Sequence, residues 1–228
     1  MKHITVLLAE DHMVVREGFR KLLEAEPDLE VVGEAQTGRQ AVEMASKLRP
    51  DVVVMDIAMP LLNGLEATRQ ILKAVPGTKV VILSAHSDDA YIERATELGA
   101  VGFLLKQTSS HSLSQAIREV QKGNTFFSSS IAKRFHKSDQ KSPNGNNGKG
   151  SLKKNAIRLS SREMEVIQLI AEGQPNKQIA SELGISVKTV EKHRDHLMRK
   201  LNIHDTAGLT RYAIANGIIE STVQLTIK

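Results

Sequence analysis

Acidic, hydroxyl and ammonium side chains stand at the ends of successive apolar runs in the first half of the chain. These residues are Glu10, Asp11, Asp56, Ser84 and Lys106. Clustered carboxylates repel one another and need a cation, and hard oxygen ligands without His or Cys favour Mg²⁺, which also takes phosphate oxygens. An Asp beside Mg²⁺ can attack phosphorus and form an aspartyl phosphate, with which a Lys can then pair. The sequence therefore predicts phosphoryl chemistry if the fold brings these residues together.

Each of these residues alone has a plainer interpretation. Asp11 could cap the helix that follows it, Asp56 could be a turn residue, and Lys106 could be a solvated surface charge. Ligands of an open α/β sheet bind beyond the carboxyl ends of its strands. The hypothesis therefore depends on all five residues occupying the same edge of one sheet.

The elements expected around these residues form a small α/β domain. Short runs that are apolar on both faces are typical of parallel strands covered by helices, and they predict strands at Ile4–Ala9, Leu29–Glu34, Asp51–Asp56, Lys79–Ser84 and Val101–Leu105. Amphipathic segments between them predict helices at Val14–Ala25, Gly38–Leu48, Gly64–Val75, Asp88–Leu98 and Ser112–Gln121. These βα units predict a doubly wound, five-stranded parallel sheet.

This half closely resembles the receiver domain of bacterial two-component response regulators, which has a flavodoxin-like fold. The matching segments are LLAEDH, VVMDIAMPLLNG, ILSAH and GAVGFLLK, and the resemblance covers about residues 1–122. It implies that Mg²⁺ is held by Glu10, Asp11, Asp56 and the backbone carbonyl of Ala58. It also implies that Asp56 accepts phosphate from a histidine kinase.

The same resemblance assigns a switch pair. Ser84 would move its hydroxyl onto the phosphoryl group, and the aromatic ring of Phe103 would reorient, while Lys106 would pair with the phosphoryl oxygens. Glu10 stands where many relatives have Asp, a tolerated departure. Gln107 stands where many have Pro, so no cis-proline step is expected there.

The two halves of the chain differ in charge. Residues 1–122 hold 14 Lys and Arg against 17 Asp and Glu, a net charge of −3, and residues 123–228 hold 17 against 9, a net charge of +8. An acidic half joined to a basic half favours nucleic acid as the partner of the basic one. Helices are expected there at Arg162–Ala171, Asn176–Leu183, Val187–Leu201 and Thr206–Asn216.

The segment Gln178–Leu197 has the spacing of a helix-turn-helix. Ala180 is small where the two helices must approach, Gly184 gives the turn a permissive backbone, and Val190 offers an apolar contact from the second helix. Ser186 is a good N-cap for that second helix. The pattern favours insertion of the second helix into the major groove of DNA.

The second helix carries a basic stripe opposite an apolar seam. The stripe is formed by Lys188, Lys192 and Arg199, and the seam by Val190, Leu197 and Leu201. A basic helix alone is more often a solvated face, but the helix-turn-helix spacing and the charge of this half favour DNA. RNA or single-stranded DNA fits poorly, because Tyr212 is the only aromatic residue after residue 135 to stack on a base.

This half looks like the LuxR-type output domain, so the whole chain resembles the NarL/FixJ family of response regulators. The matching text, LSSREMEVIQLIAEG, NKQIASELGISVKTVEKHRDHLMRKL and AIANGII, runs from about Leu159 to Ile219. The resemblance implies a buried Glu163 and a Thr206–Asn216 helix that pairs protomers in a DNA-bound homodimer. The expected DNA-binding residues are Lys177, Ser186, Lys188, Thr189, Lys192, His193, His196 and Arg199, with His193 in a packing or phosphate-contacting role.

Composition and boundaries complete the sequence-based expectations. The chain has no Cys, which excludes disulfides and thiolate metal sites and fits a cytoplasmic location, and its apolar runs are too short to cross a membrane. We expect a receiver domain at 1–122, a linker region at 123–155 that is flexible mainly over 136–155, and a DNA-binding domain at 156–228.

The leading hypothesis is a phosphorylation-dependent, sequence-specific DNA-binding transcriptional regulator that is not an enzyme beyond its own phosphorylation and dephosphorylation. Its expected partners are a sensor histidine kinase, double-stranded promoter DNA and a second copy of the chain, with RNA polymerase as a further candidate. One alternative is a Mg²⁺-dependent phosphotransferase or phosphatase acting on a small metabolite. Another is a receiver that acts without phosphate, which the complete set of acids, Ser and Lys disfavours.

Overall fold

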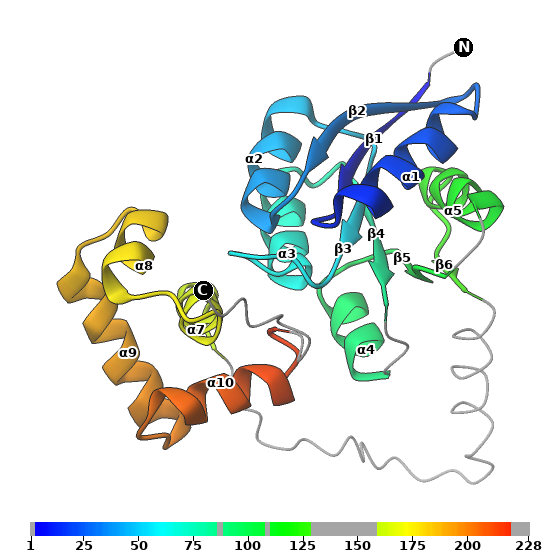
Figure 1. The fold of residues 1–228 in the computed structure, drawn as a ribbon. Coiled ribbons are helices and arrows are strands. Elements are labelled where there is room, and N and C mark those ends of the chain that lie inside the picture. The colour runs from blue at the N-terminus through cyan, green and yellow to red at the C-terminus, as the bar shows by residue number, and fades with distance from the viewer. Residues whose placement is uncertain (1–2, 86–88, 108–109, 129–158, 220–228) are drawn as a thin grey trace, which may run out of the picture.

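The computed structural model describes residues 3–85, 89–107, 110–128 and 159–219 (Figure 1). Its first part is a parallel sheet with the strand order β2-β1-β3-β4-β5-β6. The strands are β1 Ile4–Ala9, β2 Leu29–Ala35, β3 Val52–Asp56, β4 Lys79–Ser84, β5 Gly102–Leu105 and β6 Phe126–Phe127. This is the predicted doubly wound fold, with every carboxyl end at one edge.

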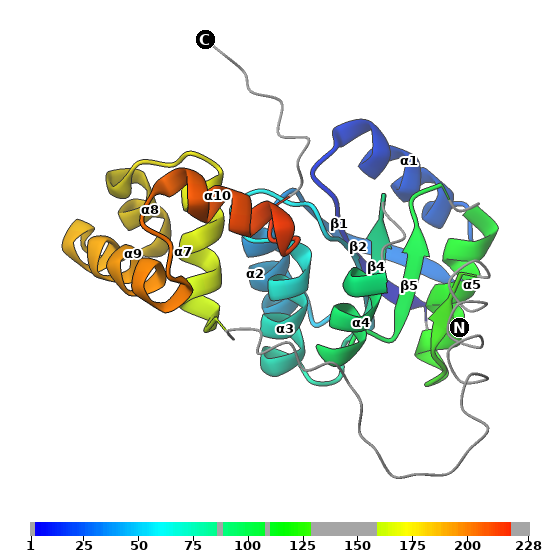
Figure 2. The ribbon, with the colours of Figure 1, turned by 90° about the horizontal axis from the view of Figure 1, so that it is seen from below.

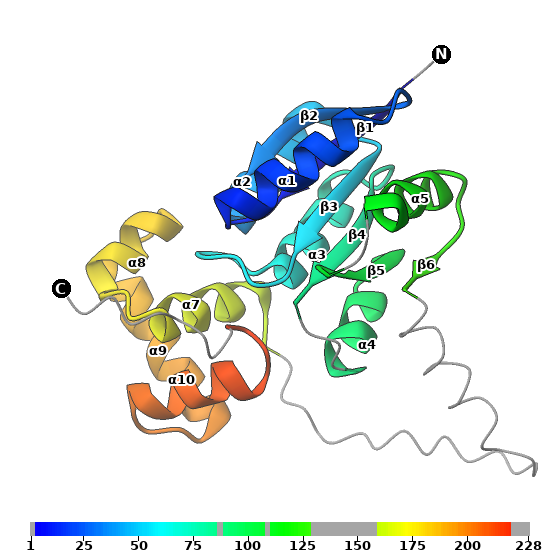
Figure 3. The same cartoon turned by 45° about the vertical axis from the view of Figure 1, so that its right-hand side comes forward.

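Helices cover both faces of this sheet (Figure 3). They are α1 Met13–Glu24, α2 Gly38–Leu48, α3 Gly64–Ala74, α4 Asp89–Glu97 and α5 Ser110–Gln121. Residues of α1 and α5 share one buried cluster with alternate strand residues, and residues of α2, α3 and α4 share the other. The strands are therefore apolar on both faces because each face packs against helices.

The prediction of five strands needs a correction, because the sheet has six. Phe126 and Phe127 pair in parallel with Gly102 and Phe103, inside the region expected to be linker. Two consecutive aromatic residues show no alternation from which a strand could be recognised. Asp88, the expected start of α4, and the expected flexible segment 136–155 lie outside the described residues.

The second part of the described chain is helical. Its helices are α7 Ser161–Ala171, α8 Asn176–Leu183, α9 Val187–Leu201 and α10 Thr206–Ala215. They pack around one apolar cluster, with Val190, Leu197 and Leu209 fully buried. Gly184 ends α8 in the left-handed region (φ 61°), and the Ser186 side chain accepts from the backbone N–H of Thr189 to begin α9. The helix-turn-helix therefore forms as its spacing predicted.

The helical part rests against α3 and α4 of the α/β part (Figure 2). Within the helical part, α7 and α10 lie on the side that faces the α/β part, and α9 lies on the side away from the sheet (Figures 1 and 2). An Arg94 nitrogen lies 3.8 Å from the Met164 sulfur, and Gly217 lies so close to the Tyr91 ring that an added Cβ would be 2.5 Å from it. Within the described ranges, no helix is long and apolar enough to span a bilayer.

Candidate functional site

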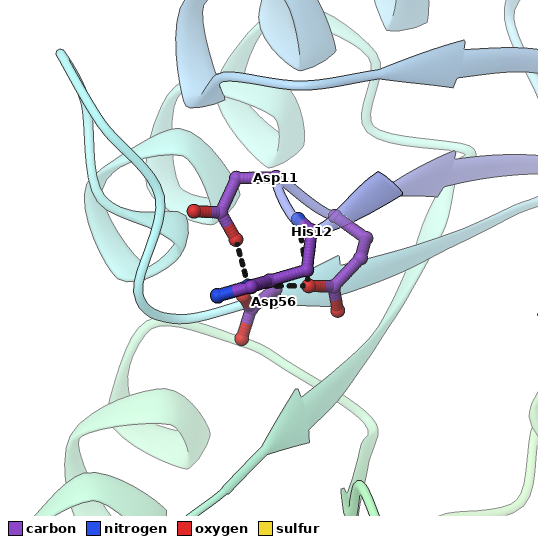
Figure 4. Close-up of side chains that lie close together, drawn as sticks. Asp11, His12 and Asp56 are labelled. Atoms are coloured by element: carbon purple, nitrogen blue, oxygen red, sulfur yellow. Dashed lines mark hydrogen bonds and ion pairs between the residues drawn. The ribbon is translucent and has the colours of Figure 1, made fainter. Parts of the chain in front are cut away.

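Four acidic or imidazole side chains gather at the carboxyl edge of the sheet. Glu10 and Asp11 follow β1, His12 comes next, and Asp56 ends β3 (Figure 4). Each offers one ligand atom, and these atoms all lie within 4.8 Å of one another. β1 and β3 are adjacent and parallel, so their carboxyl ends bring the acids together as expected. Glu10 and Asp56 are buried, with 0% and 1% of their surfaces exposed.

Lys106 completes this cluster from the end of β5. Its Nζ atom donates to Asp56 Oδ2 at 2.8 Å and lies 2.9 Å from Glu10 Oε2. Burial, followed by repulsion from Glu10, raises the pKa of Asp56 to about 6, although Lys106 acts in the opposite direction. Burial lowers the pKa of Lys106, but Asp56 and Glu10 more than reverse this, so it lies above its ordinary value. Asp56 is therefore ionised at neutral pH at a free-energy cost.

The donor set fits a hard divalent cation. Glu10 Oε2 and Asp11 Oδ1 are buried and have no hydrogen bond of good geometry, although Lys106 and His12 lie near them. One ammonium group does not balance the carboxylates of Glu10, Asp11 and Asp56. A cation such as Mg²⁺, bound through carboxylate oxygens and water, would supply the missing positive charge.

Two residues that the sequence-based prediction missed, Arg16 and His12, contact the segment that carries Glu10 and Asp11. Arg16 is buried, with 8% of its surface exposed, and its guanidinium donates to the Glu10 carbonyl at 2.9 Å and pairs with Glu34 at 3.2 Å. His12 is the N-cap of α1 but makes no side-chain cap, and its Nδ1 lies 2.8 Å from Asp11 Oδ1. The alternative that Asp11 caps this helix is therefore wrong. The sequence gives little signal for Arg16, because Arg is mostly exposed in folded proteins. It gives little for His12, because His is not among the preferred N-cap residues.

The expected switch residues lie on neighbouring strands. Ser84 ends β4 and is 2% exposed, and Phe103 in β5 is 1% exposed. Their roles stay a prediction. Ala58 lies in the loop after Asp56 and is partly exposed; its expected role as a backbone ligand stays a prediction.

Helix α9 presents the predicted basic stripe. Lys188, Lys192 and Arg199 are exposed, whereas Val190 and Leu197 are fully buried. The other expected DNA contacts are exposed at Lys177, Ser186 and His196 and partly buried at Thr189 and His193. The stripe is therefore open to solvent, on a helix that lies on the side of the helical part away from the sheet (Figure 2).

Glu163 joins α7 to α9. Its side chain forms a capping box with Ser160, and its carboxylate accepts from Lys200 Nζ at 2.7 Å and lies 3.2 Å from His196 Nε2. Burial alone would raise the pKa of Glu163, but the bonds from Lys200 and Ser160 hold it below its ordinary value. This buried acid is fully partnered, as a structural residue should be.

Helix α10 has one buried and one exposed face. Leu209 and Ala213 pack into the helical core, while Ala207, Arg211 and Ile214 are exposed, Ile214 to 40%. A face on which a small and an apolar residue flank a single arginine leaves room for pairing with a second helix.

Comparisons with known proteins agree with both halves of this description. The model of the response regulator receiver domain matches residues 6–118, and that of the bacterial regulatory proteins of the luxR family matches residues 158–213. The transcriptional regulatory protein DegU of Brevibacillus brevis is 34% identical over 225 residues, which are 95% of each chain. LiaR of Bacillus subtilis is 37% identical over 216 residues, covering 95% of this chain and 99% of its own.

Solved structures give the same result. RcsB of Salmonella typhimurium is 28% identical, covers 94% of this chain and 100% of its own, and has a TM-score of 0.56. A LuxR-family response regulator of Aurantimonas is 33% identical over 60% of this chain and 99% of its own, with a TM-score of 0.58. These relatives are regulators, which disfavours the metabolite phosphotransferase. The chain belongs to the NarL/FixJ-type two-component response regulators and is a phosphorylation-dependent, DNA-binding transcriptional regulator.

Proposed function

We propose that Asp56 is the phosphoacceptor, that a sensor histidine kinase is the donor, and that Glu10, Asp11, Asp56 and the Ala58 carbonyl hold Mg²⁺. The observation that carries this proposal is the convergence of the buried Glu10 and Asp56 carboxylates with Lys106 at the carboxyl edge of the sheet. The cation, when bound, offsets negative charge on the transferring phosphoryl oxygens.

The chain's own residues prepare the acceptor. An Asp56 oxygen forms a bond to phosphorus while the bond from phosphorus to the histidine nitrogen of the donor breaks, and that nitrogen keeps the electron pair. Lys106 pairs with the phosphoryl oxygens after transfer, since its Nζ already lies 2.8 Å from Asp56. The Ser84 hydroxyl moves toward the new group and Phe103 reorients, which transmits the change to the surface that contacts the helical part.

Phosphate mapping tests the acceptor. Incubation with a small phosphodonor and Mg²⁺, followed by trapping of the adduct, should label Asp56 alone. Chelation of Mg²⁺ should abolish the labelling, because the developing charge loses its main counter-ion. A stable adduct on another residue, or full labelling of Asp56→Asn, would refute the assignment.

We further propose that α9 reads promoter DNA in the major groove and that α10 pairs two protomers. The exposed Lys188, Lys192 and Arg199 support the first part, and the exposed face of α10 at Ile214 supports the second. Structures of an RcsB–DNA complex and of RcsB dimers bound to DNA support, by likeness, DNA binding by a dimer, without assigning the helices. A dimer on DNA would be placed to contact RNA polymerase.

Two lysines allow the DNA contacts to be separated by role. Lys192 lies in the N-terminal half of α9, where a base contact is worth about 1–3 kcal/mol of discrimination. Lys177, in α8, should meet phosphate instead. Lys192→Ala should relax preference at one operator position, and Lys177→Ala should weaken all sequences equally and reduce the salt slope by about one ion. Titration of an operator panel at several salt concentrations measures both, and uniform weakening by Lys192→Ala would assign it to phosphate.

A further inference from the structure

Helix α7 of the helical part holds the loop that follows the proposed phosphoacceptor. The Gln168 side chain accepts from the backbone N–H of Asn63 at 2.7 Å and donates to the carbonyl of Met59 at 3.0 Å. One turn later, Glu172 accepts from the backbone N–H of Leu61 at 3.1 Å. Backbone groups of three loop residues therefore depend on two side chains of the other part of the molecule.

The loop is strained where it is held. Leu61 has φ 67°, a left-handed conformation that is unfavourable for a bulky L-residue. Its side chain packs against the apolar cluster of the helical part, and its N–H is bonded to Glu172. The strain is thus offset by contacts that exist only while the two parts are docked.

The same loop is continuous with the phosphoacceptor. Gly64 donates its N–H to the Ile57 carbonyl at 2.9 Å, and a Cβ added at Gly64 would lie 1.8 Å from the Asp56 carbonyl oxygen. Ala58, the proposed backbone ligand of the cation, lies within this loop. A change in the loop conformation therefore reaches the surroundings of Asp56 through backbone contacts.

Polar contacts from other elements support this docking. Arg39 of α2 lies 3.5 Å from Glu165 and 3.2 Å from Glu182, and Gln70 of α3 donates to Glu165 at 3.0 Å. None of these contacts involves Lys188, Lys192 or Arg199, which stay exposed on α9. The contacts between the two parts therefore restrain the loop Met59–Asn63 directly, whereas they do not touch the DNA-facing side chains.

We propose that Gln168 and Glu172 are positioning residues for phosphoryl transfer, which hold Met59–Asn63 in a docked conformation and thereby slow phosphorylation of Asp56. The inference rests on the proposed role of Asp56. The incoming phosphoryl group needs room at the carboxyl edge of the sheet, and a loop fixed at three backbone positions adjusts poorly. Because coupling is reciprocal, a phosphoryl group that favours the released loop also favours separation of the two parts.

The test uses the full chain and a matched pair of double variants. Gln168→Ala with Glu172→Ala removes the loop contacts, whereas Gln178→Ala with Glu191→Ala removes the same residue types from exposed positions on α8 and α9. In the first variant, NMR should show amide exchange at Leu61 and Asn63 that is at least about tenfold faster, and acetyl phosphate with Mg²⁺ should label Asp56 about fivefold faster or more. The second variant should match the wild type in both measurements.

A variant in the receiver loop leaves α7 unchanged and so controls for the chance that the α7 substitutions disturb the folding of that helix. Leu61→Ala removes most of the docked side chain but keeps the unfavourable positive φ, so the loop should leave this conformation more readily, which should also speed exchange at Asn63 and labelling. Unchanged exchange in all variants would refute the contact, and faster exchange with labelling within twofold of wild type would refute the positioning role. Wild-type labelling at a residue other than Asp56 would instead refute the proposed function, while the exchange data would still decide whether the contact exists.

Discussion

Asp56 and Glu163 are both buried carboxylates, 1% and 5% exposed, but their surroundings differ in kind. Glu163 is matched by a cap at Ser160 and by Lys200, and its pKa lies below its usual value. Asp56 shares Lys106 with Glu10, and its pKa is raised to about 6. The first site is complete as it stands, whereas the second carries negative charge that only a further ligand can balance. A buried carboxylate whose charge is not balanced by its neighbours, rather than any buried carboxylate, therefore indicates the reactive site.

The largest expected effect comes from removing the Asp56 charge. Its pKa is about 6 in the folded chain against an ordinary 3.8, so the folded state binds this proton more tightly. The tighter binding of this proton stabilises the folded state fully below pH 3.8, and that stabilisation is lost as the pH rises through about 6. Asp56→Asn should therefore stabilise the receiver above pH 6 by up to about 3 kcal/mol, and by much less near pH 4.

Calorimetry of the full chain in chelator, at several pH values, measures this difference. Asp195→Asn, at an exposed position on α9, serves as the control and should change nothing. A destabilised Asp56→Asn variant at neutral pH would show that Lys106 fully compensates the buried charge, and the contrast with Glu163 would disappear.

A smaller effect of opposite sign is expected at Glu163. Glu163→Ala removes the capping box and the pair with Lys200 and should destabilise the helical part by about 2 kcal/mol. Glu163→Gln keeps a capping side chain and should lose about half as much. The folded pKa of Glu163 is lowered, so its contribution is present above its ordinary pKa and is lost as the pH falls through the folded value. Urea unfolding at neutral and acidic pH checks the sign, and stabilisation by Glu163→Ala would contradict it.

The smallest expected effect comes from adding the missing positive charge as Mg²⁺, which should stabilise the Asp56 site and leave the Glu163 site unaffected. Mg²⁺ at ten times its dissociation constant should stabilise the receiver by about 1.4 kcal/mol. The thermal shift should be strongly reduced in Asp56→Asn and unchanged in Glu163→Ala. A shift of equal size in all three proteins would locate the cation elsewhere.

Local patterns in the sequence predicted most of the fold. The strands and helices lie close to the expected ranges because buried parallel strands and amphipathic helices have distinct periodicities. The site residues could be placed together because all of them end strands of one parallel sheet. β6 was missed because Phe126 and Phe127 become a strand only by pairing with β5.

The contacts between the two parts could not be predicted in this way. Gln168 gave one hint, as a polar residue inside the apolar run VIQLIA, but nothing in the sequence says that its partners are Met59 and Asn63. Arg39 resembles any solvated arginine until Glu165 and Glu182 are placed beside it. Such pairs depend on the docking of two folded units, and a local periodicity does not encode docking.

The separation in sequence between the loop and α7 has a consequence for biosynthesis. Leu61 and Glu172 are 111 residues apart, and Asn63 and Gln168 are 105 apart, whereas paired residues of neighbouring strands, such as Val6 and Val52, are at most 46 apart. Domains fold as units, N-terminal first, during translation at about 5–20 residues per second. A receiver emerging from the ribosome therefore has its phosphoacceptor in place for several seconds before α7 exists. Every newly made molecule passes through a period in which the loop at Met59–Asn63 is unrestrained.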